Sequence, residues 1–461
     1  MSRPSQPTPP DPERVARAHR RAFILGVVNG ALFQMGISFV DPSTVLPAFI
    51  NELTRSELAV GVMSALAGAG WLLPQLAVAR YAQVMPRKLP VYRAAAVVRM
   101  ASLGALIASL CLFGGRPQLL LPLFLIFYAG FTFAGGAGGI SFIDVVAKTI
   151  PPYRIGSFFG QRQIYGGILG LFSAAVVRQI LREGSPLVFP RNYTYLFVMG
   201  AVAIGAGVAC FAVINEPPGR VERRRPALLE FLRRAPLVLV EDRDFRGLFV
   251  TRLLQGAAVI ALPFYVVFAG NALGMPSSML GVYLGAQTAG GIFSNFLWAP
   301  LSDRYGGKRT LVAVAVAAGA APALAVALAL LPLSHEAAGW GFAAVFLLLG
   351  CSGSGSSVAY NNYLLEVAPE VMRPTYVGVL NTFSGIVTLM PILGGVLVTA
   401  LSYQAVFAIA LLATLGGLAR ALRLRDLRDD AAGRFGHRAV PGAGGFAGQS
   451  RAGGETGAPE E

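Results

Sequence analysis

Four acidic side chains lie within or at the ends of long apolar segments of the chain: Asp41, Asp144, Asp303 and Glu366. A charge in apolar surroundings is costly unless it is paired or solvated, so each carboxylate is a candidate for ion pairing or proton transfer. Three of them, all except Asp41, occur where an apolar segment ends beside basic residues. These three predict ion pairs at helix ends.

Asp41 is the only acid toward the far end of its apolar segment, in the run FVDPSTVLP. An Asp followed by Pro is typical of a helix restart, with the Asp as N-cap and Pro42 in the first turn. The alternative is a carboxylate that takes up a proton in a partly dry cavity. Both interpretations stay open. A histidine relay is not expected, because the three histidines, His19, His335 and His437, lie in polar segments.

The composition is that of a protein that crosses a membrane several times. Of the 461 residues 55% are hydrophobic and only 13% are charged, with a mean hydropathy of +0.61, whereas charged residues make up about a quarter of a soluble domain. The net charge of +15 does not indicate nucleic acid, because the basic residues lie at segment ends instead of forming one basic face. Cys111, Cys210 and Cys351 lie in apolar runs and have no disulfide or metal-site spacing.

Twelve apolar segments are long enough to cross a bilayer, since a crossing helix needs about 20 residues. They cover residues 22–50, 57–81, 90–113, 118–147, 157–181, 192–215, 247–270, 278–302, 310–333, 340–366, 375–400 and 404–423. This predicts a polar N-terminal segment (1–21), a six-helix bundle (22–215), a linker on the membrane surface (216–246), a second six-helix bundle (247–423) and a disordered tail (424–461).

The distribution of Lys and Arg predicts the orientation. The N-terminal segment, the linker, the tail and the four short loops on the same side hold 28 of the 38 Lys and Arg residues, and the opposite loops hold four. Positive charge is retained on the cytoplasmic side. We therefore expect a multi-pass protein of the cytoplasmic membrane with both termini in the cytoplasm.

The two halves of the sequence resemble each other. A shift of 218 residues places Gly160 on Gly378 and Asp144 on Asn362, and a shift of 224 places the Arg-Tyr pair at 80–81 on the pair at 304–305. Internal repeats of this length predict two similarly built bundles.

The segment 300–311, PLSDRYGGKRTL, combines an acid, basic residues and glycines between two apolar segments. It resembles the cytoplasmic loop motif of the major facilitator superfamily, G-x-x-x-D-R-x-G-R-K, through Asp303, Arg304, Gly307, Lys308 and Arg309, with Pro300 where the family usually has glycine. Together with twelve segments, a basic linker and the repeat, the resemblance covers about residues 20–425. It implies an all-α membrane protein of two six-helix bundles related by a pseudo-two-fold axis, with a site at the midplane between them.

The resemblance also implies a gate on the cytoplasmic side. Asp303 would face the start of the fifth helix near Gly156 and pair with Arg373. Ala79 stands at the equivalent position of the first half, so we expect an asymmetric gate in which Asp303 carries more of the closure. The other gate residues are expected at the same end: Arg80, Arg87, Lys88, Asp144, Arg154 and Glu366. Simple anchoring of helix ends in lipid headgroups is the alternative for the basic residues.

In this fold the first, fourth, seventh and tenth helices line the cavity. The residues that this implies as substrate contacts, with three from the fifth helix, are Asn29, Gln34, Phe131, Arg162, Gln163, Tyr165, Arg252, Gln255, Tyr360, Asn361 and Asn362. Amides and aromatics with few charges suit a neutral or weakly anionic small molecule. The alternative for each polar residue is a hydrogen bond between helices.

The sequence thus predicts a secondary transporter of a small organic solute, working as a monomer by alternating access. Drug and proton antiporters of the superfamily often carry an acid before a proline on the first helix, as Asp41 does here, which favours proton-coupled efflux. Uptake or uniport of a metabolite such as a sugar is the alternative, because residues 166–170, GGILG, lack the proline of the antiporter motif. An enzyme or scaffold is not expected, since no metal site, cofactor site or nucleophile–base pair is recognisable.

Overall fold

The computed structural model describes residues 12–83, 85–219, 238–369 and 373–426, and all regular elements among them are helices. The first half contains α1 (Pro12–Phe39), α2 (Val45–Thr54), α3 (Glu57–Gln83), α4 (Leu89–Phe113), α5 (Pro117–Thr149), η1 (Pro152–Arg154), α6 (Ile155–Ile180) and α7 (Arg191–Ala212). The second contains α9 (Arg243–Ala257), η2 (Ala258–Ala261), α10 (Phe264–Asn271), α11 (Met279–Phe293), α12 (Asn295–Leu330), α13 (His335–Val367), α14 (Arg373–Val387), α15 (Met390–Ala400) and α16 (Tyr403–Leu422).

Within the described residues, ten segments are long and apolar enough to cross a membrane. One of them, Met279–Leu330, has 52 residues, enough for two crossings at about 20 residues each. The 26-residue α6 is not among the ten, but it packs along α1 in the same bundle. With the long segment counted twice and α6 added, the number of crossings is the twelve that the sequence predicts.

The first crossing differs from its prediction at both ends. The apolar run starts at Ala22, but α1 begins at Pro12, because proline suits the first turn of a helix and Glu13 pairs with Arg17 one turn later at 3.6 Å. The helix then breaks after Phe39 and restarts as α2 at Val45. The predicted helix over 22–50 is therefore two helices.

The charged segment at 300–311 lies inside α12. The helical path is interrupted at Gly306, whose φ of 80° is a left-handed conformation that glycine adopts at little cost. The next residue, Gly307, packs so closely on α13 that a Cβ built on it would lie 2.7 Å from the Cα of Tyr363. The two glycines of the motif thus provide a bend and a close helix contact.

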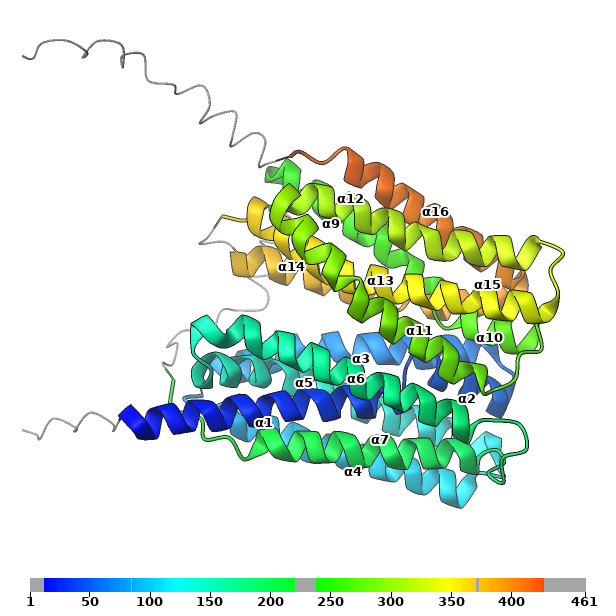
Figure 1. Ribbon diagram of the computed structural model, residues 1–461, viewed down its shortest axis with the longest axis horizontal. Coiled ribbons are helices and arrows are strands. Elements are labelled where there is room, and N and C mark those ends of the chain that lie inside the picture. Colours follow the sequence, from blue (N-terminus) through cyan, green and yellow to red (C-terminus); the bar gives the residue numbers. More distant parts are fainter. Residues whose placement is uncertain (1–11, 84, 220–237, 370–372, 427–461) are drawn as a thin grey trace, which may run out of the picture. The chain divides into compact units, whose positions relative to one another are not determined.

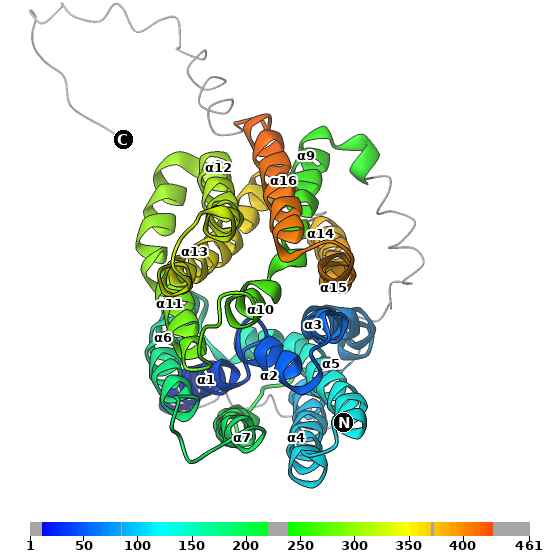
Figure 2. The ribbon, with the colours of Figure 1, turned by 90° about the vertical axis from the view of Figure 1, so that its right-hand side faces the viewer.

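The two halves form separate groups of helices that meet at one end (Figure 1). We call this the closed end. It contains α2 and α10, which lie side by side between the two groups (Figure 2). The opposite end, where α1 begins, we call the basic end because Lys88, Lys148, Arg154 and Lys308 lie there.

Contacts between the halves follow α6 against α11 and α3 against α15. A Cβ on Gly281 of α11 would lie 2.4 Å from the carbonyl oxygen of Ala174 in α6, and one on Gly61 of α3 would lie 2.2 Å from that of Pro391 in α15. Nearer the basic end, a Cβ on Gly156 or Gly160 of α6 would meet none of the described atoms within 4 Å. The halves are therefore packed together toward the closed end and apart along the first turns of α6.

Small residues permit the closest helix crossings, as is usual for helices packed within a membrane. In the second half, Gly290 of α11 and Gly350 of α13 face each other. A Cβ on Gly350 would lie 1.9 Å from the carbonyl oxygen of Gln287, and one on Gly290 would lie 2.1 Å from that of Leu347. Neither position accommodates a side chain without moving a helix.

This crossing yields a stability prediction with a control on the same helix. Gly350→Ala should lower the melting temperature in detergent, with a loss of about 1–3 kcal/mol from overpacking. Gly353→Ala, where a Cβ would meet no described atom within 4 Å, should leave the melting temperature unchanged or slightly higher, because alanine is the better helix former. Equal melting temperatures for the two variants would contradict the crossing.

Candidate functional site

A cavity of about 470 Å³ lies between the two halves, and we call it the inter-half cavity. Helices α1 and α6 line it from one half and α11 and α13 from the other. Its polar lining includes Gln34, Asp41, Arg162, Gln163 and Gln287. Of these, Gln287 is not among the residues predicted from the sequence, although it lies on the eighth predicted helix.

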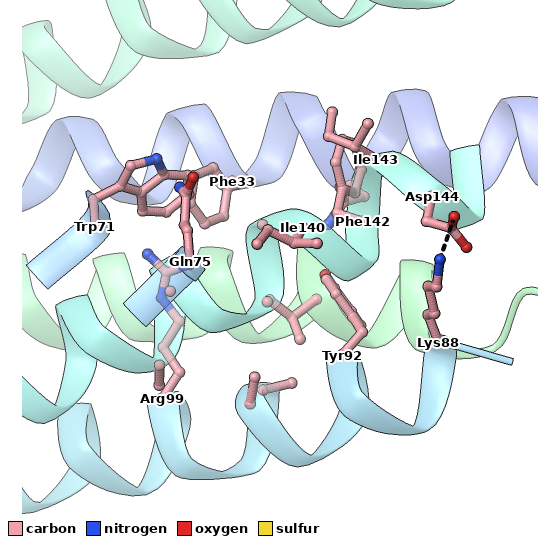
Figure 3. Close-up of a pocket in the computed structure, with 18 of the residues that line it drawn as sticks. Phe33, Trp71, Gln75, Lys88, Tyr92, Arg99, Ile140, Phe142, Ile143 and Asp144 are labelled. Atoms are coloured by element: carbon pink, nitrogen blue, oxygen red, sulfur yellow. Dashed lines mark hydrogen bonds and ion pairs between the residues drawn. The ribbon is translucent and has the colours of Figure 1, made fainter. Parts of the chain in front are cut away.

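A second cavity, of about 770 Å³, lies within the first half and is called the N-half cavity (Figure 3). Asn29, Tyr92 and Arg99 contribute polar groups to it, and the ion pair of Lys88 and Asp144 lies at the far end of the view from Arg99. Phe33 and Arg162 line this cavity as well as the inter-half cavity. The two spaces therefore meet at α1 and α6.

Arg162 is anchored where these cavities meet. Its Nη1 donates to the carbonyl oxygen of Gly26 and, at 2.9 Å, to Oδ1 of Asn29. Asn29 is itself buried and donates to the carbonyl oxygen of Gly207 in α7 at 2.8 Å. Asn29 thus forms a hydrogen bond between helices and also orients the guanidinium at the cavity. Helix bridging and cavity lining, the two roles considered for it from the sequence, therefore occur together.

A third cavity, of about 360 Å³, lies in the second half and contains Arg252, Gln255 and Tyr360. The Tyr360 hydroxyl donates to Oε1 of Gln255 at 3.1 Å, and the Arg252 guanidinium lies 4.5 Å from the Tyr360 ring centroid. Three of the five predicted substrate residues of the seventh and tenth helices therefore line one cavity, where Tyr360 contacts the other two.

Asp41 lies at the break between α1 and α2. Its Oδ1 accepts hydrogen bonds from the backbone N–H and hydroxyl groups of Ser43 and Thr44, at 2.6–2.9 Å. These bonds stabilise the turn that leads into α2, as is common for Asp in turns. The helix restarts as predicted, but its N-cap residue is Thr44, which makes no side-chain capping bond. The same side chain lines the inter-half cavity, and the Ser43 hydroxyl lies 2.9 Å from Oε1 of Gln287 in the other half.

A hydrogen-bond network at the closed end joins the halves. Asn51 of α2 and Asn271 of α10 exchange amide hydrogen bonds at 2.9 and 3.1 Å. Arg55 donates to Oδ1 of Asn271 at 3.2 Å, Asn271 donates to the Tyr403 hydroxyl at 3.3 Å, and that hydroxyl donates to Oε1 of Glu57. We call these five residues the closed-end network.

The closed-end network is absent from the sequence predictions, although a signal for it exists. Asn51 and Asn271 are 220 residues apart, which lies between the repeat shifts of 218 and 224. They are equivalent positions of the two halves, and a two-fold relation lets the same side chain serve both partners. A search for identical polar residues at the repeat spacing would have found them.

The family model described as Major Facilitator Superfamily matches residues 187–388 and 247–444, together more than half of the 461 residues. The chain belongs to the Major Facilitator Superfamily. No curated protein matches the sequence.

Solved structures with the same fold are transporters. A bacterial homologue of the iron transporter ferroportin in an inward-facing state has a TM-score of 0.66 at 13% identity, covering 89% of this chain and 98% of that one. The nucleoside transporter NupG has a TM-score of 0.63 at 15% identity, covering 88% of this chain and 99% of that one. A D-xylose–proton symporter has a TM-score of 0.61 at 14% identity, covering 89% of this chain and 98% of that one. Family and fold identify a multi-pass membrane transporter and point away from an enzyme.

In this superfamily member the predicted gate residues of the first half form a charge cluster. Asp144 pairs with Lys88 at 2.7 Å and with Lys148 at 2.6 Å. Lys148 also contacts Glu216 at 2.8 Å, and Glu216 accepts backbone hydrogen bonds from Lys88 and from Leu89 at 2.7–2.9 Å. The ion pairing expected of Asp144 is present, and Glu216, predicted only as a linker residue, completes it.

In the second half, the backbone N–H of Gly307 donates to Oε1 of Glu366 at 2.9 Å. Asp303, Arg304 and Arg309 are exposed at the same end and Lys308 is half-buried. In the first half Arg87 is exposed and the Arg154 guanidinium lies 4.3 Å from the Phe23 ring centroid. The side chains of Arg80 and Arg373 lie outside the described residues, so the gate stays a prediction.

Four predicted substrate residues line none of the three cavities: Phe131, Tyr165, Asn361 and Asn362. Phe131 is buried with its ring centroid 4.4 Å from the guanidinium carbon of Arg99. Tyr165 is 51% exposed, Asn361 is exposed, and Asn362 donates to the Ser302 hydroxyl. Helical spacing alone could not separate the cavity face of a helix from the faces toward lipid and neighbouring helices.

The charge cluster yields a second stability prediction. Glu216 is 7% exposed and accepts three backbone bonds and the Lys148 ammonium. Glu216→Gln replaces one acceptor oxygen by a donor, so it should lower the free energy of unfolding by about 1–3 kcal/mol. Thermal unfolding in detergent measures this. Glu183→Gln at an exposed site is the control, and an equal melting temperature for both variants would show that the cluster contributes no stability.

Proposed function

We propose that the protein is a secondary transporter that moves a small organic solute by alternating access. The observation that supports this proposal most directly is the inter-half cavity, which is lined by helices of both halves. The closed-end network joins the halves at one end of the molecule. In this fold, rocking of the halves about a midplane site exposes that site to one side at a time. Separation of the halves along the first turns of α6 supports access from the basic end.

We infer that the basic end is cytoplasmic, because Lys and Arg are retained on that side. The arrangement described then faces inward. The ferroportin homologue supports this assignment, since its inward-facing structure has a TM-score of 0.66 to this chain and its outward-facing structure 0.56. We place the protein in the cytoplasmic membrane as a monomer, with both termini inside.

For coupling we propose proton-driven efflux with Asp41 as the proton carrier. Asp41 lines the cavity beside the contact of Ser43 with Gln287, so a change in its charge would act where the halves meet. Its four bonds to Ser43 and Thr44 favour the alternative, in which Asp41 only stabilises the turn before α2 and the protein is an uptake symporter or uniporter.

Asp41→Asn separates these roles, because an asparagine oxygen can still accept the bonds from Ser43 and Thr44 while the titratable group is lost. In liposomes, the purified protein should accumulate a solute from a compound panel against its concentration gradient only when a pH gradient is imposed, and Asp41→Asn should abolish this gradient-driven flux. Exchange of solute at equal pH and the melting temperature should be retained. Undiminished gradient-driven transport by Asp41→Asn would remove the coupling role, and no transport of any compound would reject the proposed function.

A further inference from the structure

Arg99 of α4 is a buried cation without an anionic partner. The residue is 7% exposed, and none of the described residues accepts a hydrogen bond from it or forms an ion pair with it. Its Nε is fully buried and unpaired. Arg99 is not among the substrate residues predicted from the sequence, because the third helix is not one of those expected to line the substrate cavity.

Aromatic rings surround the Arg99 guanidinium. Its carbon lies 4.4 Å from the Phe131 ring centroid, 4.7 Å from that of Phe33 and 6.0 Å from that of Trp71. Cation–π contacts are worth about 0.5–2 kcal/mol each, whereas the penalty for burying an ion is several kcal/mol. The rings orient the guanidinium and offset only part of this penalty.

The other charges of the N-half cavity leave its Arg99 end positive. The ionisable groups that line it are Lys88, Tyr92, Asp144 and Arg162 besides Arg99. Asp144 is already paired with Lys88 and Lys148. Lys88, the N-cap of α4, is eleven residues before Arg99, or about 16 Å along the helix at 1.5 Å per residue. Arg162 adds a second guanidinium, and the groups that accept its hydrogen bonds, in Gly26 and Asn29, are neutral.

The space beside Arg99 suits an apolar body. Ile140, Phe142 and Ile143 line the cavity between Arg99 and the Lys88–Asp144 pair, and Trp71 lies at the Arg99 end (Figure 3). Its volume of about 770 Å³ lies within the range of small-molecule sites, about 300–1,000 Å³. A ligand with an anionic group at one end and an apolar body would match both the Arg99 guanidinium and the apolar lining.

We propose that the N-half cavity binds an amphipathic organic acid whose carboxylate pairs with Arg99 and whose apolar body lies against Trp71 and Ile143. This rests on the proposed function, because it names the class of solute that the transporter carries. Phe33 and Arg162 line both cavities, so this site is adjacent to the inter-half cavity. An Arg–carboxylate pair in a partly dry site is among the stronger polar contacts available.

The test compares an acid with its neutral amide. Calorimetric titration of the full chain in phosphatidylcholine nanodiscs with 1-naphthoate and 1-naphthamide should show about tenfold tighter binding of the acid, as expected for a charge-assisted hydrogen bond. The preference should disappear in Arg99→Gln and persist in Arg252→Gln, the matched control in the third cavity, of about 360 Å³. Equal affinities for the two compounds, no binding of either, or a preference that survives Arg99→Gln would overturn the proposal.

A second measurement separates a binding residue from a structural one. Without ligand, Arg99→Met removes the unpaired charge and keeps an unbranched chain, so its melting temperature should equal or exceed that of the wild type. A clear fall would assign Arg99 a structural role and overturn the proposal. Acid preference without liposome transport would reject only the proposed function, and transport without acid preference would reject only this inference.

Discussion

The reciprocal amide pair of Asn51 and Asn271 is the contact on which the arrangement of the halves depends. Both residues come from the short helices α2 and α10, which exist because the first and seventh crossings break before the closed end. Two neutral amides exchange hydrogen bonds without an ion-pair desolvation penalty, and such bonds contribute about 0.5–1.5 kcal/mol each. Two hydrogen bonds of this strength stabilise the arrangement in which the halves meet at the closed end, and they can still break when the halves move.

Charge in apolar surroundings is the second constraint on this molecule. At the basic end the carboxylates of Asp144 and Glu216 are matched by lysines and backbone N–H groups, so the cluster is locally neutralised and fixes α4 and α5. The arginines in the cavities are not matched in this way. Arg99 contacts rings, and Arg252 lies on Tyr360 and 3.5 Å from the Ser384 hydroxyl. A buried charge that has no partner within the protein lowers stability, and such charges are typical of ligand-binding sites.

Much of the fold could be predicted from the sequence because it follows from segment length, apolar composition and the repeat. The twelve crossings and the family membership are confirmed. The breaks at 40–44 and at Gly306 were harder to predict, since a proline or glycine marks a possible bend but not whether the helix continues. Of the residues that line the cavities, the family resemblance named Asn29, Arg162 and Arg252, whose role as substrate contacts stays a prediction. Arg99, Glu216, Asn51 and Asn271 were not selected, because their roles depend on contacts between distant segments that no local pattern records.

Alternating access through the inter-half cavity is the central claim, and distances between spin labels at the two ends test it most directly. After replacement of Cys111, Cys210 and Cys351, one pair of labels at the exposed positions 157 and 304 reports on the basic end and another at 182 and 272 on the closed end. In nanodiscs, combined alanine substitution of Asn51 and Asn271 should shorten distances at the basic end and lengthen those at the closed end. Unchanged distances at both ends, or changes of the same sign, would contradict the account.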